Sequence, residues 1–217
     1  MSGSVIRLDD GHEIRLTGIE AKGDAAKEKL QRLIAGKELK QDNGVIDRYG
    51  RVAADIYAST DNGETVWLQG ALLKDGFAFV YPPTGSEPRL ADLLKAEHDA
   101  RTAGIGIWGE AEYADKPADR PRAIPYGRFV FIAGKVVKAE RVKNKFYLNF
   151  GDNWRSDFTA TIAAHDLRLF TKAGIDPETY QGKTVRVRGW VKRDFGPMIT
   201  VTHPAQIELL GETATRP

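Results

Sequence analysis

The sequence predicts a mainly β protein of the α+β class, built as two consecutive β-rich domains. Its 217 residues are enough for two domains of about 100 residues each. Apolar and polar residues alternate at the start of the first half, and the second half contains several segments that read as strands. The charge balance also changes along the chain. Residues 1–120 carry 16 Lys or Arg and 21 Asp or Glu, whereas residues 121–217 carry 16 and 9.

Composition narrows the classes of protein to consider. The chain is 41% hydrophobic and 29% charged, which is typical of a globular protein. No apolar run approaches the roughly 18 residues that span a bilayer, so we expect no membrane partner. No signal peptide is visible. The location is cytoplasmic, or secreted or periplasmic if an upstream signal has been removed. The absence of cysteine excludes disulfides, thiolate zinc sites and cysteine nucleophiles.

The first half begins with strand patterns and then changes to helical ones. Residues 4–8 and 13–19 alternate like two strands of a hairpin that turns at Asp10 and Gly11. Asp24 is predicted to be the N-cap of a helix that runs to about residue 35. Further strands are expected near 37–42 and 51–58, and further helices near 66–75 and 87–103, the last opening at Ser86 and Pro88.

The boundary between the domains is marked by a change of composition. Residues 111–127, AEYADKPADRPRAIPYG, are rich in Pro, Ala and charge and lack a hydrophobic period. This pattern predicts a linker between a first domain at 1–110 and a second domain at 128–210.

The second half predicts five strands and one short helix. The strands are expected at 128–138, 144–150, 157–163, 183–193 and 196–209, and the helix at 163–174. A helix between the third and fourth of five strands is the order of elements in the OB-fold, a small Greek-key barrel. The second domain is therefore predicted to be an OB-fold.

The first 110 residues resemble the staphylococcal nuclease (thermonuclease) family. The resemblance is carried, in order, by IRLTGIEA (14–21), DRYGR (47–51), VWLQGALLKDGFAFVY (66–81) and GIGIWGE (104–110). It implies an OB-type barrel with three helices packed on it, and so two OB-fold barrels in tandem. The family's first strand would lie before residue 1. We therefore expect that the chain is part of a longer one or that another segment closes the barrel.

The family resemblance also implies a set of site residues. In that family two aspartates hold a calcium ion, a glutamate activates or positions water, and two arginines neutralise the phosphate. The arginines fall on Arg15 and Arg51, whereas the metal aspartates fall on Ser4 and Glu20 and the glutamate on Gly23. The resemblance thus implies that the two arginines still clamp a phosphate but that the glutamate acting on the water is missing. The resemblance therefore implies either no cofactor or a calcium ion that is held weakly through Glu20.

These departures favour a protein that has lost catalysis. Loss of a general base alone costs roughly 10²- to 10⁴-fold in rate. In one alternative, Asp24 replaces the base and Asp9 or Asp10 helps to hold a metal, which gives a divalent-metal-dependent nuclease with a rebuilt site. Asp24 has a competing role as a helix cap.

Each arginine also has an alternative, structural role. Arg15 and Arg51 can form structural pairs with Glu20 or Asp47, because a buried arginine needs such partners. If the pocket is open, two guanidiniums near one carboxylate form a phosphate site. Tyr49 either stacks on a base or covers its turn.

The second domain offers basic and aromatic residues in its predicted connections. Those assigned to nucleic-acid binding are Arg141, Lys143 and Lys145 in 139–145, Trp154 and Arg155 in 151–157, and Lys192, Arg193 and Phe195 in 192–197. Cations beside aromatic rings suit single-stranded DNA or RNA, whose phosphates and bases they contact respectively. Phe146, Phe150 and Trp190 are expected in the core.

The sequence thus predicts a thermonuclease-like protein without catalysis that binds nucleic acid or another polyanion through both domains. Two alternatives are the metal-dependent nuclease and a scaffold that binds a protein partner. GIGIWG matches a dinucleotide-binding pattern by chance, because it follows a predicted helix rather than a strand. The four histidines show no metal-ligand spacing.

Overall fold

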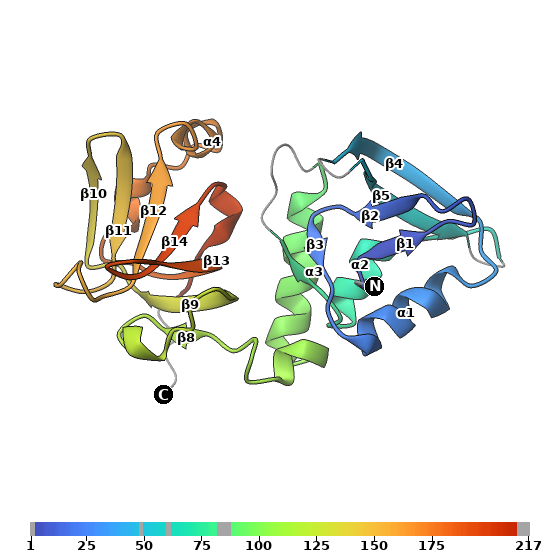
Figure 1. The fold of residues 1–217 in the computed structure, drawn as a ribbon, viewed down its shortest axis with the longest axis horizontal. Helices are drawn as coiled ribbons and strands as arrows, with labels where there is room; N and C mark the ends of the chain where they lie inside the picture. The colour runs from blue at the N-terminus through green and yellow to red at the C-terminus, as the bar shows by residue number, and fades with distance from the viewer. Residues whose placement is uncertain (1–2, 48–49, 60–61, 82–87, 212–217) are drawn as a thin grey trace. The chain divides into compact units, whose positions relative to one another are not determined.

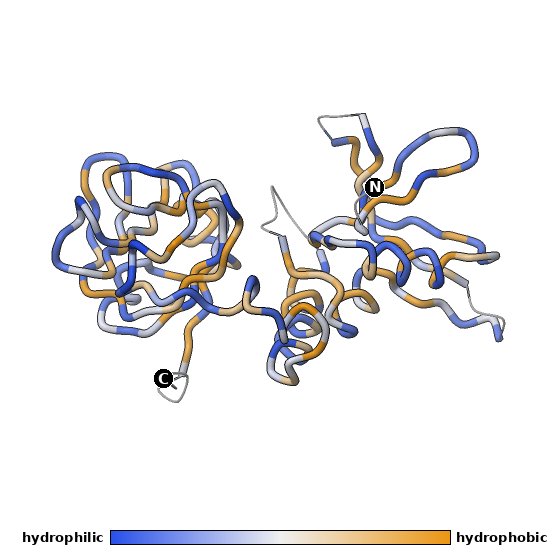
Figure 2. Tube along the Cα trace, turned by 60° about the horizontal axis from the view of Figure 1, so that its bottom comes forward, coloured by the Kyte–Doolittle hydropathy of each residue, from blue (hydrophilic) through white to orange (hydrophobic). Residues whose placement is uncertain are grey.

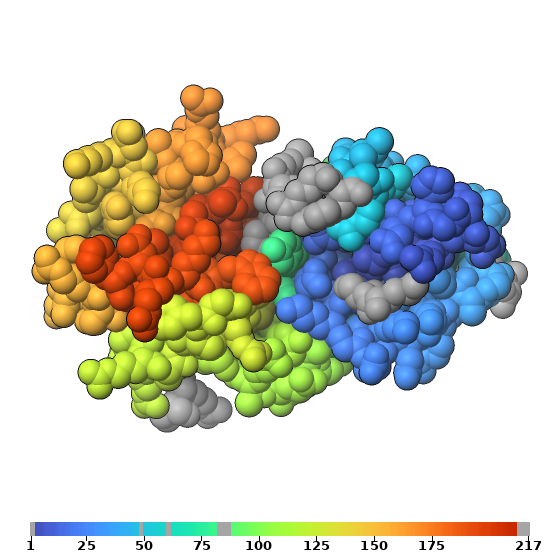
Figure 3. All heavy atoms as spheres, viewed as in Figure 1, coloured from blue at the N-terminus to red at the C-terminus, as the bar shows by residue number. Residues whose placement is uncertain are grey.

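The computed structural model describes residues 3–47, 50–59, 62–81 and 88–211 and forms two compact units, residues 1–111 and 112–217 (Figure 1). The described residues are mainly β, with four α-helices. None of these helices has both the length and the apolar character that crossing a membrane requires. Drawn as spheres, the side chains fill the spaces between the ribbons within each unit (Figure 3).

The first unit combines a sheet with three helices. Its elements are β1 (Val5–Arg7), β2 (Glu13–Leu16), β3 (Ile19–Glu20), α1 (Asp24–Ile34), β4 (Leu39–Ile46), β5 (Val52–Ser59), β6 (Thr65–Trp67), α2 (Leu68–Lys74), β7 (Phe79–Val80) and α3 (Leu90–Thr102). The strand order is β1-β2-β5-β4, with β6 beside β5, and β3 pairs with β7. β2 and β5 are parallel, whereas the other pairs are antiparallel.

One face of this sheet packs on the helices. Ile14 and Leu16 of β2 and Ala54 and Ile56 of β5 are buried in one cluster with residues of α1 and α2. Because side chains alternate along a strand, the odd-numbered residues of both strands face the other way. Figure 2 shows hydrophobic and hydrophilic stretches following one another along the trace of each unit.

The start of α1 differs from its prediction. Gly23, with φ 85°, occupies the N-cap position, and no side chain caps the helix. Asp24 is the first helical residue, so its assignment as the cap is wrong. Its charge instead stands in the first turn, where the helix dipole favours an anion. The predicted start of the last helix at Ser86 lies outside the described residues.

The second unit is built around one larger sheet. Its elements are β8 (Lys116–Pro117), β9 (Phe129–Lys135), β10 (Lys138–Val142), β11 (Lys145–Asn149), β12 (Thr159–Ala163), α4 (Leu167–Lys172), β13 (Thr184–Asp194), β14 (Gly196–Val201) and β15 (Ile207–Leu209). The strand order is β10-β11-β12-β14-β13-β9-β8, and β15 also pairs with β13. β12 and β14 are parallel.

The first predicted strand of this unit is divided in two. Val136 donates its N–H to the carbonyl of Lys183, beside β13, and Val137 donates to the carbonyl of Asn149 in β11. The chain therefore changes partner strand between these two valines. As a result β9 and β10, which follow each other in sequence, pair with different strands.

The core predictions for the second unit are correct for two of three aromatic residues. Phe146 and Phe150 are buried, as predicted. Trp190 is 46% exposed, so its placement in the core is wrong. Val187 and Val191 of the same strand point into the core. The alternation of β13 therefore turns Trp190 outward, where it packs edge-on against Phe129.

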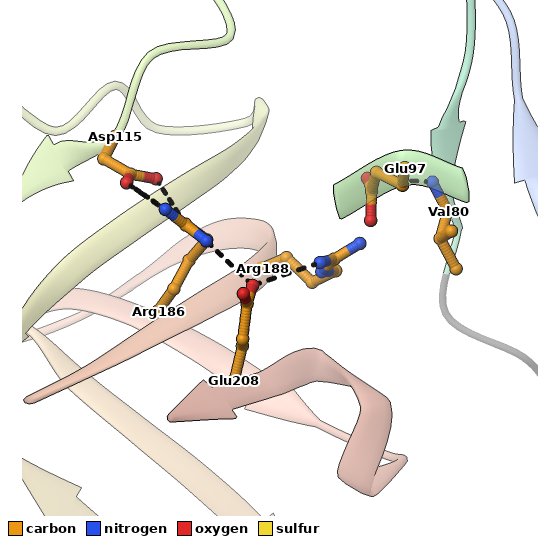
Figure 4. Close-up of polar contacts among 6 residues, drawn as sticks. All are labelled: Val80, Glu97, Asp115, Arg186, Arg188 and Glu208. Carbon is orange, nitrogen blue, oxygen red and sulfur yellow. Dashed lines mark hydrogen bonds and ion pairs between the residues drawn. The ribbon is translucent and has the colours of Figure 1, made fainter. Parts of the chain in front are cut away.

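Much of the predicted linker is part of the second unit. β8 pairs with β9, and Ala118 and Ile124 are buried in the core of that unit. Asp115 accepts hydrogen bonds from Nε and Nη2 of Arg186 at 2.8 and 2.7 Å, and Nη1 of Arg186 donates to Glu208 at 2.8 Å (Figure 4). This part of the predicted linker is therefore folded onto the second unit.

Candidate functional site

Arg15 and Arg51 project from one face of the first unit's sheet. Arg15 of β2 lies opposite Ala53 of β5 in parallel register, and Arg51 precedes Ala53 by two residues. The N–H of Asp47 donates to the carbonyl of Arg51 at 2.8 Å, which extends the β4–β5 ladder beyond its last assigned pair. The alternation of β5 therefore includes Arg51, and both guanidiniums belong to the face opposite the helices.

Each of these arginines has a carboxylate partner, as the structural alternative requires. Nη2 of Arg15 lies 3.8 Å from Oε2 of Glu20, and its guanidinium lies 5.7 Å from the centroid of the Tyr81 ring. Nε and Nη2 of Arg51 lie 2.9 and 2.8 Å from Oδ2 of Asp47. The side chains of Arg15 and Arg51 are nevertheless 30% and 25% exposed, so a ligand can reach both.

The positions that correspond to the family's acids offer one carboxylate. Ser4 is buried, and Glu20 is the only acid of the three. Gly23 has no side chain, and a Cβ added there would meet no atom within 4 Å. Within the ranges that the structure describes, no three His, Cys, Asp or Glu side chains gather where they could hold a metal ion.

The substitute acids considered from the sequence have local roles. Asp24 stands in the first turn of α1. Oδ1 of Asp10 accepts the N–H of His12 at 2.9 Å and lies 3.1 Å from Nδ1 of the same residue. These hydrogen bonds lower the pKa of Asp10, so it stays a carboxylate bound to its own turn.

Sequence inspection missed Asp55, a buried acid on the same face as the two arginines. Its carboxylate accepts hydrogen bonds from Nε1 of Trp67 at 3.2 Å, Nδ2 of Asn43 at 3.3 Å and Oγ1 of Thr17 at 3.5 Å. The donors come from β4, β6 and the end of β2, so Asp55 ties these segments to β5. A lone acid within an apolar strand is the signal that could have identified it.

The basic loops predicted in the second unit are tight hairpin turns. Arg141 lies in β10 and Lys145 in β11, and Lys192 and Arg193 lie in β13, so their placement in loops is wrong. The turns themselves hold Lys143 and Phe195, with φ 53° and 60°. Strand pairing at both places continues almost to the turn.

The structure brings three of the predicted binding residues together. The rings of Trp154 and Phe195 lie 5.2 Å apart edge to face, and the guanidinium of Arg155 lies 4.6 Å from the Trp154 ring. Lys143 is at the opposite end of β11 from the loop that carries Trp154. Tyr49, assigned to the first unit's site, lies outside the described residues.

Comparison with known proteins assigns the first unit to a family. Residues 13–110 match the family model described as staphylococcal nuclease homologue. The chain is 36% identical over 110 residues to the staphylococcal-like nuclease CAN1 of Arabidopsis thaliana, which covers 48% of this chain and 31% of that protein. The probable staphylococcal-like nuclease CAN1 of Oryza sativa is 37% identical over 112 residues, 49% of this chain and 31% of the rice protein.

A bacterial relative is matched over more of its own length. The micrococcal nuclease of Shigella flexneri is 27% identical over 129 residues, which are 50% of this chain and 74% of that protein. The chain covers less than a third of each plant relative, so the likeness concerns one domain of those proteins. With the order of elements in the first unit, these matches show that residues 13–110 form a staphylococcal nuclease-like domain.

Proposed function

We propose that this protein binds nucleic acid through both of its units and that its nuclease-like domain does not cleave the bound strand. The observation that carries the proposal is the pair Arg15 and Arg51 on one sheet face, together with a glycine at position 23, to which the resemblance assigns the family's catalytic glutamate. Guanidiniums bind phosphate oxygens with paired, charge-assisted hydrogen bonds. Cleavage needs in addition a base and a firmly held metal ion.

The contacts of the two arginines are compatible with phosphate binding. At 3.8 Å the Arg15–Glu20 contact is longer than a hydrogen bond, so a phosphate can compete for this guanidinium. Arg51 is held by Asp47 through Nε and Nη2, which fixes the direction of its guanidinium. We infer that Arg51 is the orienting residue of the clamp and Arg15 the adaptable one.

A tandem OB architecture is the second part of the proposal. In the second unit the consecutive strands β9 and β10 pair with β13 and β11, so one bent segment joins two strands that are far apart in the sheet order. The helix α4 lies between β12 and β13 in the sequence. Both features support a five-stranded Greek-key barrel of the kind that binds oligonucleotides.

The net charge of the second half supports its participation. Residues 121–217 carry 16 basic and 9 acidic residues. Binding driven by phosphate contacts releases counterions, so its affinity falls steeply as salt rises. Salt-insensitive or undetectable oligonucleotide binding would instead favour the protein-interaction scaffold.

The names of the relatives favour a second candidate, a divalent-metal-dependent nuclease with a rebuilt site. Incubation of the protein with single-stranded DNA and with RNA, in calcium, magnesium or manganese, separates the two functions. We expect binding without cleavage. Turnover that Arg51→Ala abolishes would overturn the loss of catalysis, because a contaminating nuclease would not respond to that substitution.

A further inference from the structure

Two aromatic side chains in the second unit are exposed together. Trp154, in the β11–β12 loop, is 51% exposed, and Phe195, in the β13–β14 turn, is 68% exposed. Their rings meet edge to face with centroids 5.2 Å apart. The residues are distant in sequence, so this pair exists only because the loop and the turn lie side by side. Neither ring contributes to the core cluster of the unit.

The loop beneath Trp154 is fixed by its own hydrogen bonds. Asn153 donates its N–H to Oδ2 of Asp157 at 2.8 Å, and the carbonyl of Asn153 accepts the N–H of Asp157 at 2.9 Å. Oδ1 of Asn153 also accepts the N–H of Arg155 at 3.2 Å. A side chain at Gly151 would collide with the Asp157 carboxylate. Trp154 is therefore held in place before any ligand arrives.

The turn that carries Phe195 is pressed against this loop. A Cβ on Gly196 would lie 2.5–3.0 Å from backbone atoms of Ser156 and Asp157, which is too close for a carbon atom. Phe195 itself has φ 60°, a left-handed conformation that favours glycine or asparagine and costs a phenylalanine about 1 kcal/mol or more. An exposed ring gains no core burial that offsets this cost. Strain of this kind is typical of functional positions.

Arg155 lies against one ring of the aromatic pair, and Lys192 and Arg193 lie in β13, shortly before Phe195 in the sequence. The guanidinium of Arg155 lies 4.6 Å from the Trp154 ring, and that of Arg193 lies 4.8 Å from the ring of Tyr126. Lys192 is exposed in the same strand as Arg193. The adjacent acids Asp152 and Asp194 reduce the local positive charge, so flat apolar rings rather than charge dominate this surface.

We propose that Trp154 and Phe195 form a base-stacking subsite for single-stranded nucleic acid, with Arg155 contacting the adjoining phosphate. The proposal rests on the nucleic-acid binding proposed above and names the strand form that this surface takes. In a duplex the faces of the bases are covered by their neighbours, whereas in a single strand they can stack on aromatic side chains. The subsite thus discriminates between strand forms rather than between sequences.

Fluorescence anisotropy on the full chain tests the subsite. The probes are a labelled oligothymidylate, a duplex of equal length and an abasic strand that keeps the sugar–phosphate backbone. We expect Trp154→Ala and Phe195→Ala each to lower affinity for the oligothymidylate by roughly 5- to 100-fold, the range for loss of one stacked base. Affinity for the abasic strand should not change. Trp154→Phe should retain most of the binding.

Two variants separate a binding role from a structural one. Trp190→Ala removes another tryptophan of the same unit, 46% exposed and outside the pair, and should leave oligothymidylate affinity unchanged. Phe195→Gly suits the left-handed turn, so it should lower affinity without lowering the melting temperature. A fall in melting temperature with unchanged affinity would overturn the subsite.

The remaining outcomes distinguish the two proposals. Salt-dependent binding that is equal for the oligothymidylate and the abasic strand and unaffected by both alanine variants would overturn the subsite and leave the proposed function intact. Absence of binding to all three probes would overturn the proposed function. A blue shift of the tryptophan fluorescence with phosphatidylserine vesicles but not with oligothymidylate, which Trp154→Ala removes, would assign the surface to membranes and overturn the subsite.

Discussion

Arg15 and Arg51 lie on the same face of one sheet, because β2 and β5 are parallel with Arg15 opposite Ala53. Each is paired with its own acid, Glu20 or Asp47. The face therefore carries two guanidiniums, of which Arg51 is hydrogen-bonded to Asp47 and Arg15 makes a longer contact with Glu20. We therefore expect the nuclease-like domain to bind a phosphodiester through these two arginines.

Removal of either arginine should weaken nucleic-acid binding uniformly across sequences. A phosphate contact carries no sequence information, and each one lost reduces the slope of log affinity against log salt by about 1. Anisotropy titrations of Arg15→Ala and Arg51→Ala over a series of salt concentrations measure this slope. Arg32→Ala, on the exposed side of α1, is the matched control. Unchanged slopes in both variants would contradict the phosphate clamp.

Asp55 should be important for the stability of the first unit. Asp55→Ala leaves the donors of Trp67, Asn43 and Thr17 without this acceptor, and one buried unpaired group costs about 1–3 kcal/mol. Urea unfolding should therefore shift to lower urea concentration. The control is Asp99→Ala, whose solvent-exposed pair with Lys95 should contribute little to stability. Equal effects of the two substitutions would argue against the Asp55 network.

Arg186 should hold the segment around Asp115 on the second unit. Burial alone lowers the pKa of Arg186, but the hydrogen bonds and charges of Asp115 and Glu208 outweigh it and raise that pKa, so the guanidinium stays charged. Arg186→Ala should cost about 3 kcal/mol, at the lower end of values for broken buried pairs because the acids are partly exposed. Arg186→Lys should not restore stability, since lysine lacks the planar fork.

Limited proteolysis provides a second measurement for Arg186. Cleavage within residues 111–127 should become faster in Arg186→Ala, because the segment loses its anchor. Arg168→Ala, exposed on α4, should leave both the unfolding and the cleavage pattern unchanged. Resistance of the segment in Arg186→Ala would show that strand pairing of β8 alone holds it.

His203 should make the second unit less stable in mild acid. Burial lowers its pKa, and its Nδ1 accepts the N–H of Ala205 at 3.1 Å. The pKa of His203 is lower in the folded chain than its value of about 6.5 in the unfolded chain, so between these two values the unfolded chain binds more protons. The stability that is present above about pH 7 is therefore lost as the pH falls from the unfolded toward the folded pKa.

Unfolding midpoints measured between about pH 7 and pH 5 test the role of His203. His203→Asn keeps an acceptor for the cap without the titration, so it should flatten the dependence. His98→Asn, exposed on α3, should not alter it. A dependence that persists in His203→Asn would assign it to other groups.

Local patterns in the sequence predicted several of the helices and strands and part of the core. The alternation around Phe146 and Phe150 predicted their burial because a strand with one buried face has a period of two. The four blocks that resemble thermonuclease identified the domain that the family model matches at residues 13–110. Trp190 was misplaced because its prediction did not follow the alternation of its strand, which places Val187 and Val191 in the core and turns Trp190 outward.

Local sequence patterns did not predict contacts between residues that lie far apart in the sequence. The strands β10 and β13 extend through residues predicted as loops, because hydrogen bonds to β11 and β14 continue almost to the turns. Asp115 and Ala118 looked like part of a linker because their partners lie far along the chain in β13 and the core.

The sequence by itself determined which side chains are present: it contains Arg15 and Arg51, it has a glycine at position 23, and it has no cysteine. The tertiary structure decided which of these groups share a surface. Parallel pairing of β2 with β5 placed the arginines on one face, and contact between a loop and a turn joined Trp154 to Phe195. Such neighbourhoods depend on strand register and packing between distant segments, which local sequence patterns do not specify.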